Sequence, residues 1–291
     1  MRMVLVASTL LLLLTGHWGW AMLTLLLLLA LSAVRTGGGT DDAAPPETPV
    51  GIRLEPYARP AGPADPDYGL DVFAFDDWLA RPDVRGTPGG GLGAATGMAA
   101  YNVQAGVEGE RSMAHMLATL PLDGARVYLS CRNPADTTGE ADIDAIVATG
   151  DTVWLLDAKH YTPARSGMWL VPTPGLGDRT GAGELRAYGP DVNIIGTPLP
   201  ALDRIAPERI YHASGNMAWA ADAIRRALPG VNVVPVVLLS RTNGGVYGVA
   251  RGTVFPGGVP VSTADRWHDG FASRGAPSIH MDTYLTGLVK R

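Results

Sequence analysis

Three acidic residues and one lysine are spaced in a way that suits chemistry at a phosphate group. Asp144 lies on one predicted strand, and Asp157 and Lys159 lie two residues apart on the next. Because side chains alternate along a strand, Asp157 and Lys159 point to the same face. Two close carboxylates repel each other unless a cation lies between them, and their oxygens suit Mg²⁺ or Mn²⁺. Glu110, at the start of a preceding helix, is the third acid that would complete such a cluster.

The lysine is unusual in this chain. Of the 23 Lys and Arg residues only Lys159 and Lys290 are lysines. In a chain where nearly every cation is arginine, the one internal lysine lies at the position where a compact ammonium group is wanted. Such a group stabilises charge that develops on phosphate, while a metal lowers the pKa of a bound water. Each motif alone also has a structural interpretation. Asp144 would be a surface residue, Asp157 and Lys159 an ion pair, and Glu110 a helix N-terminal carboxylate.

Alternating and helical hydrophobic patterns predict the elements that must position these residues. A helix is expected over 108–120, and strands over 126–130, 142–148 and 152–159, with a hairpin turn at 149–151. Residues 162–215 are rich in Gly and Pro and are expected to be irregular. The pattern continues with a helix over 217–228, a strand over 231–239 whose Pro235 indicates an edge or bulge, and closing helices over 262–272 and 282–290. This order predicts a mixed α/β domain.

The constellation resembles the PD-(D/E)xK nuclease core, and in particular the nuclease-related domain, NERD. The resemblance is carried by Gly109-Glu110 in a helix, Asp142-Ile143-Asp144 in a strand and Asp157-Ala158-Lys159 in the next strand, followed by Tyr161 and Gly167. It implies a restriction-endonuclease-like mixed sheet flanked by helices. It also implies Glu110, Asp144 and Asp157 as metal ligands, these three with Lys159 as catalytic residues, Mg²⁺ or Mn²⁺ as cofactor, and DNA as partner. The family usually has a Gln in the following helix, where this chain has Ala220, with Asn216 nearby.

The N-terminal part of the chain differs in kind from the rest. Residues 3–34 carry no charge and are interrupted by Gly and Trp near residues 15–20. We expect two short transmembrane helices within residues 1–35 that form a hairpin in the lipid bilayer, because Trp prefers the membrane interface. A single long span and a cleaved signal peptide are the alternatives. Arg2 and Arg35 flank the segment and favour a cytoplasmic location for the remainder.

Composition bounds the rest of the molecule. Residues 36–105 are rich in Pro and Gly and are expected to be a linker, which leaves 106–291 as the nuclease-like domain. The net charge of −5 excludes a polycationic nucleic-acid coat, and the single cysteine, Cys131, excludes a disulfide framework and a Cys-based zinc cluster. The sequence predicts a membrane-anchored, Mg²⁺-dependent DNA nuclease. The alternative is a non-catalytic module that binds nucleic acid or protein at the membrane.

Overall fold

The computed structural model describes residues 56–58, 64–90, 100–138, 141–161, 167–172, 183–192, 194, 199–202, 204–242, 247–250 and 253–290. The contacts group residues 51–291 into one compact unit. The hairpin expected over residues 3–34 lies outside the described residues. Of the helices that the described residues form, none is long and apolar enough to cross a membrane.

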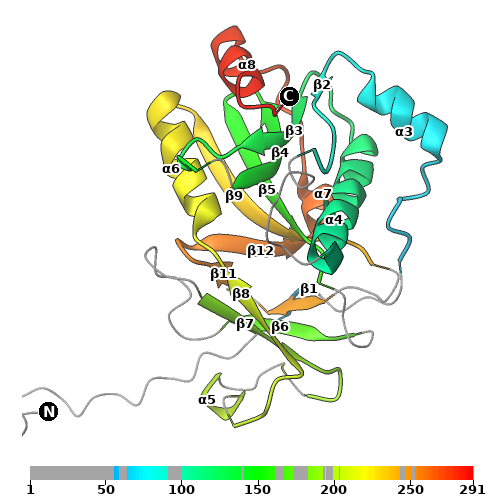
Figure 1. The fold of residues 1–291 in the computed structure, drawn as a ribbon, viewed down its shortest axis with the longest axis vertical. Coiled ribbons are helices and arrows are strands. Elements are labelled where there is room, and N and C mark those ends of the chain that lie inside the picture. Colours follow the sequence, from blue (N-terminus) through cyan, green and yellow to red (C-terminus); the bar gives the residue numbers. More distant parts are fainter. Residues whose placement is uncertain are drawn as a thin grey trace, which may run out of the picture. The chain divides into compact units, whose positions relative to one another are not determined.

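A seven-stranded mixed sheet is the centre of this unit (Figure 1). Antiparallel pairing joins β3 (Arg126–Arg132), β4 (Asp142–Thr149) and β5 (Thr152–Lys159), whereas β9 (Asn232–Leu239) pairs in parallel with both β5 and β12 (Val259–Thr263). The prediction of a large mixed sheet flanked by helices is confirmed. In spatial order the strands are β11 (Val254–Phe255), β12 (Val259–Thr263), β9 (Asn232–Leu239), β5 (Thr152–Lys159), β4 (Asp142–Thr149), β3 (Arg126–Arg132) and β2 (Val84–Arg85).

Helices cover both faces of this sheet (Figure 1). Each face carries one apolar cluster, named here after the helix that covers it. Val147 on β4 packs in the α4-face cluster, under α4 (Ala100–Ala118), and its neighbour Ile146 packs in the α6-face cluster, under α6 (Asn216–Ala227), as strand alternation requires. The first face carries α3 (Val72–Leu79), α4 (Ala100–Ala118) and α7 (Ala264–Gly270), and the second carries α6 (Asn216–Ala227) and α8 (Ile279–Thr286).

Short polar side chains begin three of these helices. The N-cap residues Asp71, Thr263 and Ser278 accept hydrogen bonds from backbone amides of the first turns of α3, α7 and α8. Such caps satisfy amides that have no partner inside the helix. By contrast, the N-cap residue of α6 is Gly215, which provides no side-chain cap.

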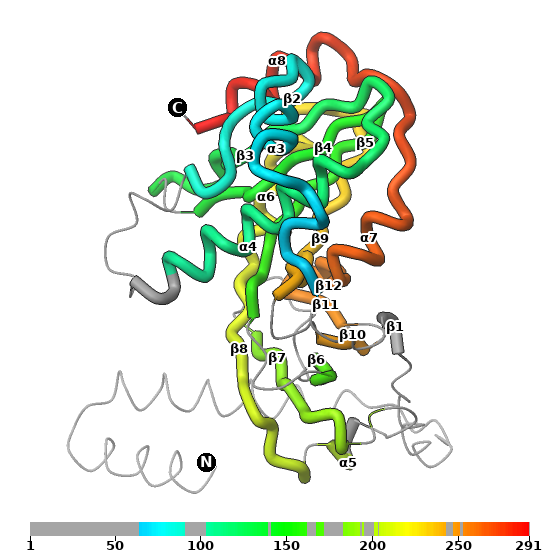
Figure 2. Tube along the Cα trace, turned by 90° about the vertical axis from the view of Figure 1, so that its right-hand side faces the viewer, coloured from blue at the N-terminus to red at the C-terminus, as the bar shows by residue number. Residues whose placement is uncertain are grey.

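A second, five-stranded sheet comes largely from the segment expected to be irregular, 162–215. Figure 2 shows β6, β7 and β8 grouped with α5 and β10. The apolar cluster of the α6 face continues into this sheet through residues such as Leu170 and Leu185. Its strands are short and separated by Gly and Pro, so they carry too little periodic signal to be seen in the sequence. The elements are β1 (Pro56–Ala58), β10 (Gly248–Ala250), β6 (Trp169–Pro172), β7 (Gly183–Tyr188), β8 (Arg209–Ala213) and α5 (Leu199–Leu202).

Part of the segment expected to be a linker also folds onto the domain. Residues 64–90 form α3 and β2, and β2 extends the large sheet by pairing in parallel with β3. Phe75 and Trp78 on α3 are buried in the α4-face cluster. Their burial explains why this segment is ordered despite flanking Pro and Gly, because apolar area removed from water offsets the entropy of ordering the chain.

Pro235 lies on a strand that is flanked on both sides, not at the edge of the sheet. However, the pairing of β9 with β12 covers only Val237–Leu239, so among the described strands Pro235 has a neighbour, β5, on one side only. The missing amide of a proline is tolerated where no ladder hydrogen bond is needed.

Candidate functional site

The large sheet is interrupted at Asp144. The β3–β4 ladder pairs Leu129 with Ala145 and Cys131 with Ile143 but omits the pair between them, Ser130 with Asp144. The β4–β5 ladder ends at the pair of Ala145 with Leu156, one residue before Asp144 would meet Asp157. Asp144 is therefore left out of both ladders that β4 forms, and its polar groups are available for other partners.

At this point the side chains of both β3 and β4 switch from one face of the sheet to the other. On β3, Val127 and Leu129 belong to the α4-face cluster, yet Cys131 belongs to the α6-face cluster. The cause is Ser130, whose φ of 50° puts its backbone in the left-handed region. A non-glycine residue rarely adopts this conformation, and residues held in it cluster at functional sites.

The carboxylate of Asp144 links β4 to β5 where the backbone pairing of these strands has ended. Its Oδ2 atom accepts a hydrogen bond of 2.6 Å from the backbone amide of Ala158 on β5. The residue is 8% exposed. Burial, reinforced by the negative charges of Asp157 and Glu110, raises the pKa of Asp144 well above its ordinary value. A buried carboxylate with acidic neighbours is a position where a cation would restore the charged form.

Asp157 and Lys159 form an ion pair beside this carboxylate. The Nζ atom of Lys159 lies 2.8 Å from Oδ1 of Asp157. Burial disfavours the ammonium charge, but the carboxylates of Asp157 and Asp144 outweigh that cost and raise the pKa of Lys159. Both side chains share the strand face of Leu155, which belongs to the α6-face cluster. As predicted from the spacing, they lie on one face of β5.

Glu110 approaches the interruption from α4, on the opposite face of the sheet. It is 3% exposed. Its Oε2 atom accepts hydrogen bonds from the Gly89 amide at 2.8 Å and from the Ser130 hydroxyl at 3.3 Å. Burial raises the pKa of Glu110 despite these two donors. Its charge acts on Asp144, but its carboxylate is held by Gly89 and Ser130 and not by the other predicted residues.

The four predicted residues thus gather around one interruption but do not form a ready three-acid cage. Among the described residues, no three His, Cys, Asp or Glu side chains are grouped so that they could hold a metal ion. Asp144 and Asp157 supply a pair of carboxylates. Mg²⁺ is commonly bound through one or two carboxylates together with water. The oxygen donors of this pair, and the raised pKa of Asp144, therefore fit a hydrated Mg²⁺ or Mn²⁺.

The structure adds Ser130 and two glycines to the set that sequence reasoning identified. The Ser130 hydroxyl donates to the Thr87 carbonyl at 2.6 Å and accepts from the Gly90 amide at 3.1 Å, in addition to its contact with Glu110. The signal in the sequence was a lone polar residue inside an otherwise apolar strand. Gly89 and Gly90 belong to a glycine run that reads as linker, and nothing local to that run indicates that it packs against α4.

The α6 side of the sheet holds Tyr161, which fits the family pattern, and Ala220 and Asn216, which lie at or near the position of its usual Gln. Ala220 is fully buried in the apolar cluster, so it offers no polar group in place of the usual Gln. Tyr161, two residues after Lys159, stacks on Tyr211 with ring centroids 4.0 Å apart. Asn216 lies at the start of α6, where its carbonyl accepts a hydrogen bond from Asn133.

A comparison with known protein families supports the predicted resemblance over the region of the interruption. No curated protein and no solved structure gave a match. The family model of the nuclease-related domain, NERD, matches residues 105–180. Glu110, Asp144, Asp157 and Lys159 all lie inside the matched segment, so the part of the chain that contains the interruption is similar to a nuclease-related domain.

Proposed function

We propose that this protein is a divalent-metal-dependent nuclease that hydrolyses DNA phosphodiester bonds at the interruption of the large sheet. The observation that carries the proposal is the buried Asp144 carboxylate, left out of both ladders and placed beside the ion pair of Asp157 and Lys159. The match to a nuclease-related domain over the same residues supports it.

Each residue has a role that follows from its surroundings. Asp144 and Asp157 would hold Mg²⁺ or Mn²⁺, and the negative charge of Glu110, which acts on Asp144 from the other face of the sheet, would add to the attraction for the cation. When bound, the cation supplies a water of lowered pKa and neutralises charge on the phosphate. Lys159 stays protonated because its pKa is raised, so its ammonium is ready to donate to a phosphate oxygen. Its partial exposure, 31% of the side chain, leaves it open to a substrate.

The same proposal places the enzyme at a membrane. Residues 3–34 contain no charged side chain, which favours an anchor in the lipid bilayer. Arg2 and Arg35 on either side favour a hairpin with the nuclease domain in the cytoplasm. An anchored enzyme of this kind would act on DNA that comes close to the membrane.

Cleavage of supercoiled plasmid DNA tests the activity. The full chain, purified in a mild detergent, is incubated with Mg²⁺ or Mn²⁺ beside Asp157→Asn, Lys159→Met and the control Asp151→Asn. Asp151 lies on the turn before the same strand and is exposed, with a 3.7 Å ion pair to Arg274, so its substitution controls for the removal of one negative charge outside the interruption. We expect metal-dependent nicking by the wild type and by Asp151→Asn. Loss of one charge-stabilising group from such a site typically costs about 10²-fold or more in rate, so the other two variants should be nearly inactive.

A non-catalytic binding module is the second candidate. It is favoured by the absence of a three-acid grouping among the described residues and by the ion pair that occupies Asp157. In that case the wild type would retain DNA without nicking it, and Asp157→Asn would bind as well as the wild type or better, because a negative charge is removed. Equal nicking by all four proteins would contradict the assignment of the active site.

A further inference from the structure

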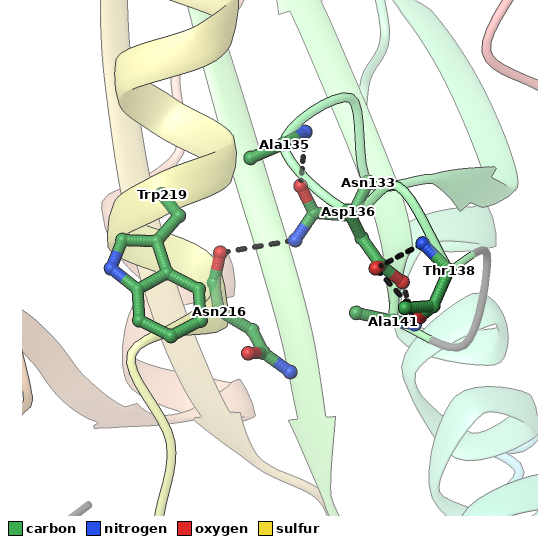
Figure 3. A pocket seen from close by; sticks show the side chains of 7 residues that line it. All are labelled: Asn133, Ala135, Asp136, Thr138, Ala141, Asn216 and Trp219. Atoms are coloured by element: carbon green, nitrogen blue, oxygen red, sulfur yellow. Dashed lines mark hydrogen bonds between the residues drawn. The ribbon is translucent and has the colours of Figure 1, made fainter. Parts of the chain in front are cut away.

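A cavity of about 320 Å³ opens between the start of α6 and the loop that joins β3 to β4 (Figure 3). Ligand pockets in proteins begin at about this size, and the space suits one small planar group, not a duplex. Figure 3 shows the indole of Trp219 on one wall and the labelled residues from Asn133 to Thr138, with Ala141, on the other. The lining residues are Asn133, Ala135, Asp136, Thr138, Ala141, Asn216 and Trp219.

The loop wall of this cavity is preformed. The Asp136 carboxylate accepts hydrogen bonds from the Thr138 amide and hydroxyl at 2.8 and 2.7 Å and from the Ala141 amide at 2.5 Å. Asn133 accepts from the Ala135 amide and donates to the Asn216 carbonyl, which joins the loop to α6. The wall therefore needs no rearrangement before a ligand enters, and this lowers the cost of binding.

The other wall presents an aromatic surface. Trp219 is 49% exposed, one of the most exposed large apolar residues in the described part of the chain. Its ring packs against the backbone of Gly215, where an added Cβ would lie 3.3 Å from the indole, so the glycine lets the ring lie close to the helix start. An exposed indole held in place in this way is a stacking surface for a flat ring.

The charge of the lining selects what can stack there. None of the seven lining residues is Lys, Arg or His, and one of them, Asp136, is acidic. The lining therefore offers no cationic partner to a phosphate or another anion. A neutral ring with hydrogen-bonding edges is accommodated, because the Asn216 side chain also lines the space. An unpaired nucleobase is a flat, neutral ring with hydrogen-bonding edges and therefore suits this space.

The position of the cavity relates it to the interruption of the sheet. Ala141, a lining residue, precedes β4, and Asp144 follows three residues later, which is about 10 Å along a strand. The cavity lies at α6, on the face of the sheet that also carries Asp157 and Lys159. The phosphate site proposed at Lys159 and the indole of Trp219 therefore share one face of the sheet, as a single DNA strand that contacts both would require.

We propose that this cavity binds one unpaired base of a DNA strand, stacked on Trp219, next to the phosphate at the interruption. The proposal rests on the nuclease function proposed above, which it deepens by specifying single-stranded or locally unpaired DNA as the preferred substrate.

Binding of labelled oligonucleotides tests the pocket separately from cleavage. The full chain in detergent is titrated against a 12-nucleotide single strand and the matching duplex, with Ca²⁺ in place of Mg²⁺. The variants are Trp219→Ala, Trp219→Phe, which keeps a stacking ring, and the control Phe73→Ala, an exposed aromatic on α3. A second series of single strands carries one abasic position that is moved along the sequence.

Stacking of one base is worth enough that Trp219→Ala should weaken single-strand binding about tenfold or more, while Trp219→Phe loses less. The affinity for the duplex should be the same in the Trp219 variants as in the wild type. Phe73→Ala should bind the single strand as tightly as the wild type does. One abasic position should weaken wild-type binding by a similar factor and have no further effect on Trp219→Ala, because the two partners of one contact are not additive. If Trp219→Ala binds the single strand as tightly as the wild type, or loses as much affinity for the duplex as for the single strand, the proposed base-binding pocket is wrong.

Plasmid nicking in Mg²⁺ by the same preparations separates this proposal from the nuclease function. If the wild type nicks DNA and Trp219→Ala binds single strands normally, the pocket fails and the nuclease stands. If the abasic and Trp219→Ala effects appear without any nicking, the base pocket stands and the nuclease function fails.

Discussion

Single residues create the site by breaking the regularity of the sheet. Ser130 adopts a left-handed backbone conformation opposite Asp144, and both strands change faces there. The backbone strain at Ser130 is about 1–3 kcal/mol. It is offset by the hydrogen bonds that its hydroxyl makes to Thr87, Gly90 and Glu110. The interruption is therefore a balance between an unfavourable backbone and a favourable side chain at one position.

This balance gives a prediction for two substitutions of Ser130. Ser130→Ala keeps the strain, loses the hydroxyl and leaves buried partners unsatisfied, so we expect a loss of about 1–3 kcal/mol in the free energy of unfolding. Ser130→Gly loses the same hydrogen bonds but relieves the strain, so it should be more stable than the alanine variant by about 1 kcal/mol. Urea unfolding followed by tryptophan fluorescence measures both. An alanine variant as stable as the wild type would contradict this account.

The residue scale is also where sequence reasoning succeeded most. Asp157 and Lys159 share a face of β5 because alternation in a short, strongly apolar strand is a local property, and the structure has this strand at the predicted bounds. The contacts of Ser130 and Gly89 with Glu110 could not be predicted, because they join residues that are 20 and 21 positions apart in the chain. No local pattern records such a contact.

At the scale of elements, the close approach of α4 to β5 positions Glu110. A Cβ added at Gly109 would lie 2.9 Å from Cβ of His160, and the Gly109 carbonyl accepts a hydrogen bond from the hydroxyl of Ser240, which follows the neighbouring strand β9. The glycine of the Gly-Glu pair therefore lets the helix lie against the strand. The helix was expected to begin at 108 but begins at Ala100, because the polar and glycine residues before 108 hide the first turns from a hydrophobic pattern.

Gly109→Ala should therefore push α4 away from β5. Overpacking of this kind costs about 1–3 kcal/mol in the free energy of unfolding, and we expect metal-dependent nicking to fall as Glu110 moves. Gly270→Ala is the matched control, since nothing lies within 4 Å of an added Cβ there and it should change stability by less than about 0.5 kcal/mol. Thermal and urea unfolding of the two variants measure the difference. Equal stability of the two would show that the close approach is not required.

A second element-scale contact holds α8 to the sheet and depends on pH. The Asp282 carboxylate accepts hydrogen bonds from the Tyr128 hydroxyl at 2.7 Å and from Arg85 at 3.3 Å. Burial alone would raise the pKa of Asp282, but the Tyr128 hydrogen bond and the charges of Arg85 and Arg126 together lower it. A carboxyl whose folded pKa lies below its unfolded value of about 3.9 stabilises the fold above that value, and the contribution is lost as the pH falls through the folded pKa.

Asp282→Asn should therefore be less stable than the wild type at pH 7 by about 1–2 kcal/mol, and the difference should shrink below about pH 4. Unfolding by urea at a series of pH values gives the comparison, with Asp77→Asn on the exposed side of α3 as control. A difference that stays constant down to pH 2, or that grows there, would contradict the assigned sign.

At the scale of the whole molecule, the domain begins earlier than its sequence suggests. Residues 64–90 contribute a helix, a strand and the Gly89 amide that holds Glu110. The general class of fold followed from the strong central patterns over 126–159 and 216–239. The small sheet and β2 did not, because they are stabilised by pairing with distant strands and have weak patterns of their own.

Removal of residues 1–99 should therefore damage the domain, although it leaves all four predicted site residues in place. The lost Phe75 and Trp78 leave uncovered apolar surface on α4, and each such loss is worth about 3 kcal/mol or more. A chain that lacks only residues 1–50 should keep the stability of the compact unit. Urea midpoints of the two shortened proteins decide the matter. Equal midpoints would mean that 64–90 adds nothing to the fold.

The central claim is that the carboxylates at the sheet interruption form a cation site, and calorimetric titration with Mn²⁺ tests it most directly. We expect one site in the full chain, with affinity reduced at least about tenfold in Asp144→Asn and in Asp157→Asn, and unchanged in the exposed control Asp151→Asn. If Asp144→Asn and Asp157→Asn bind Mn²⁺ as tightly as the wild type, or if the wild type binds none, the metal centre proposed here does not exist.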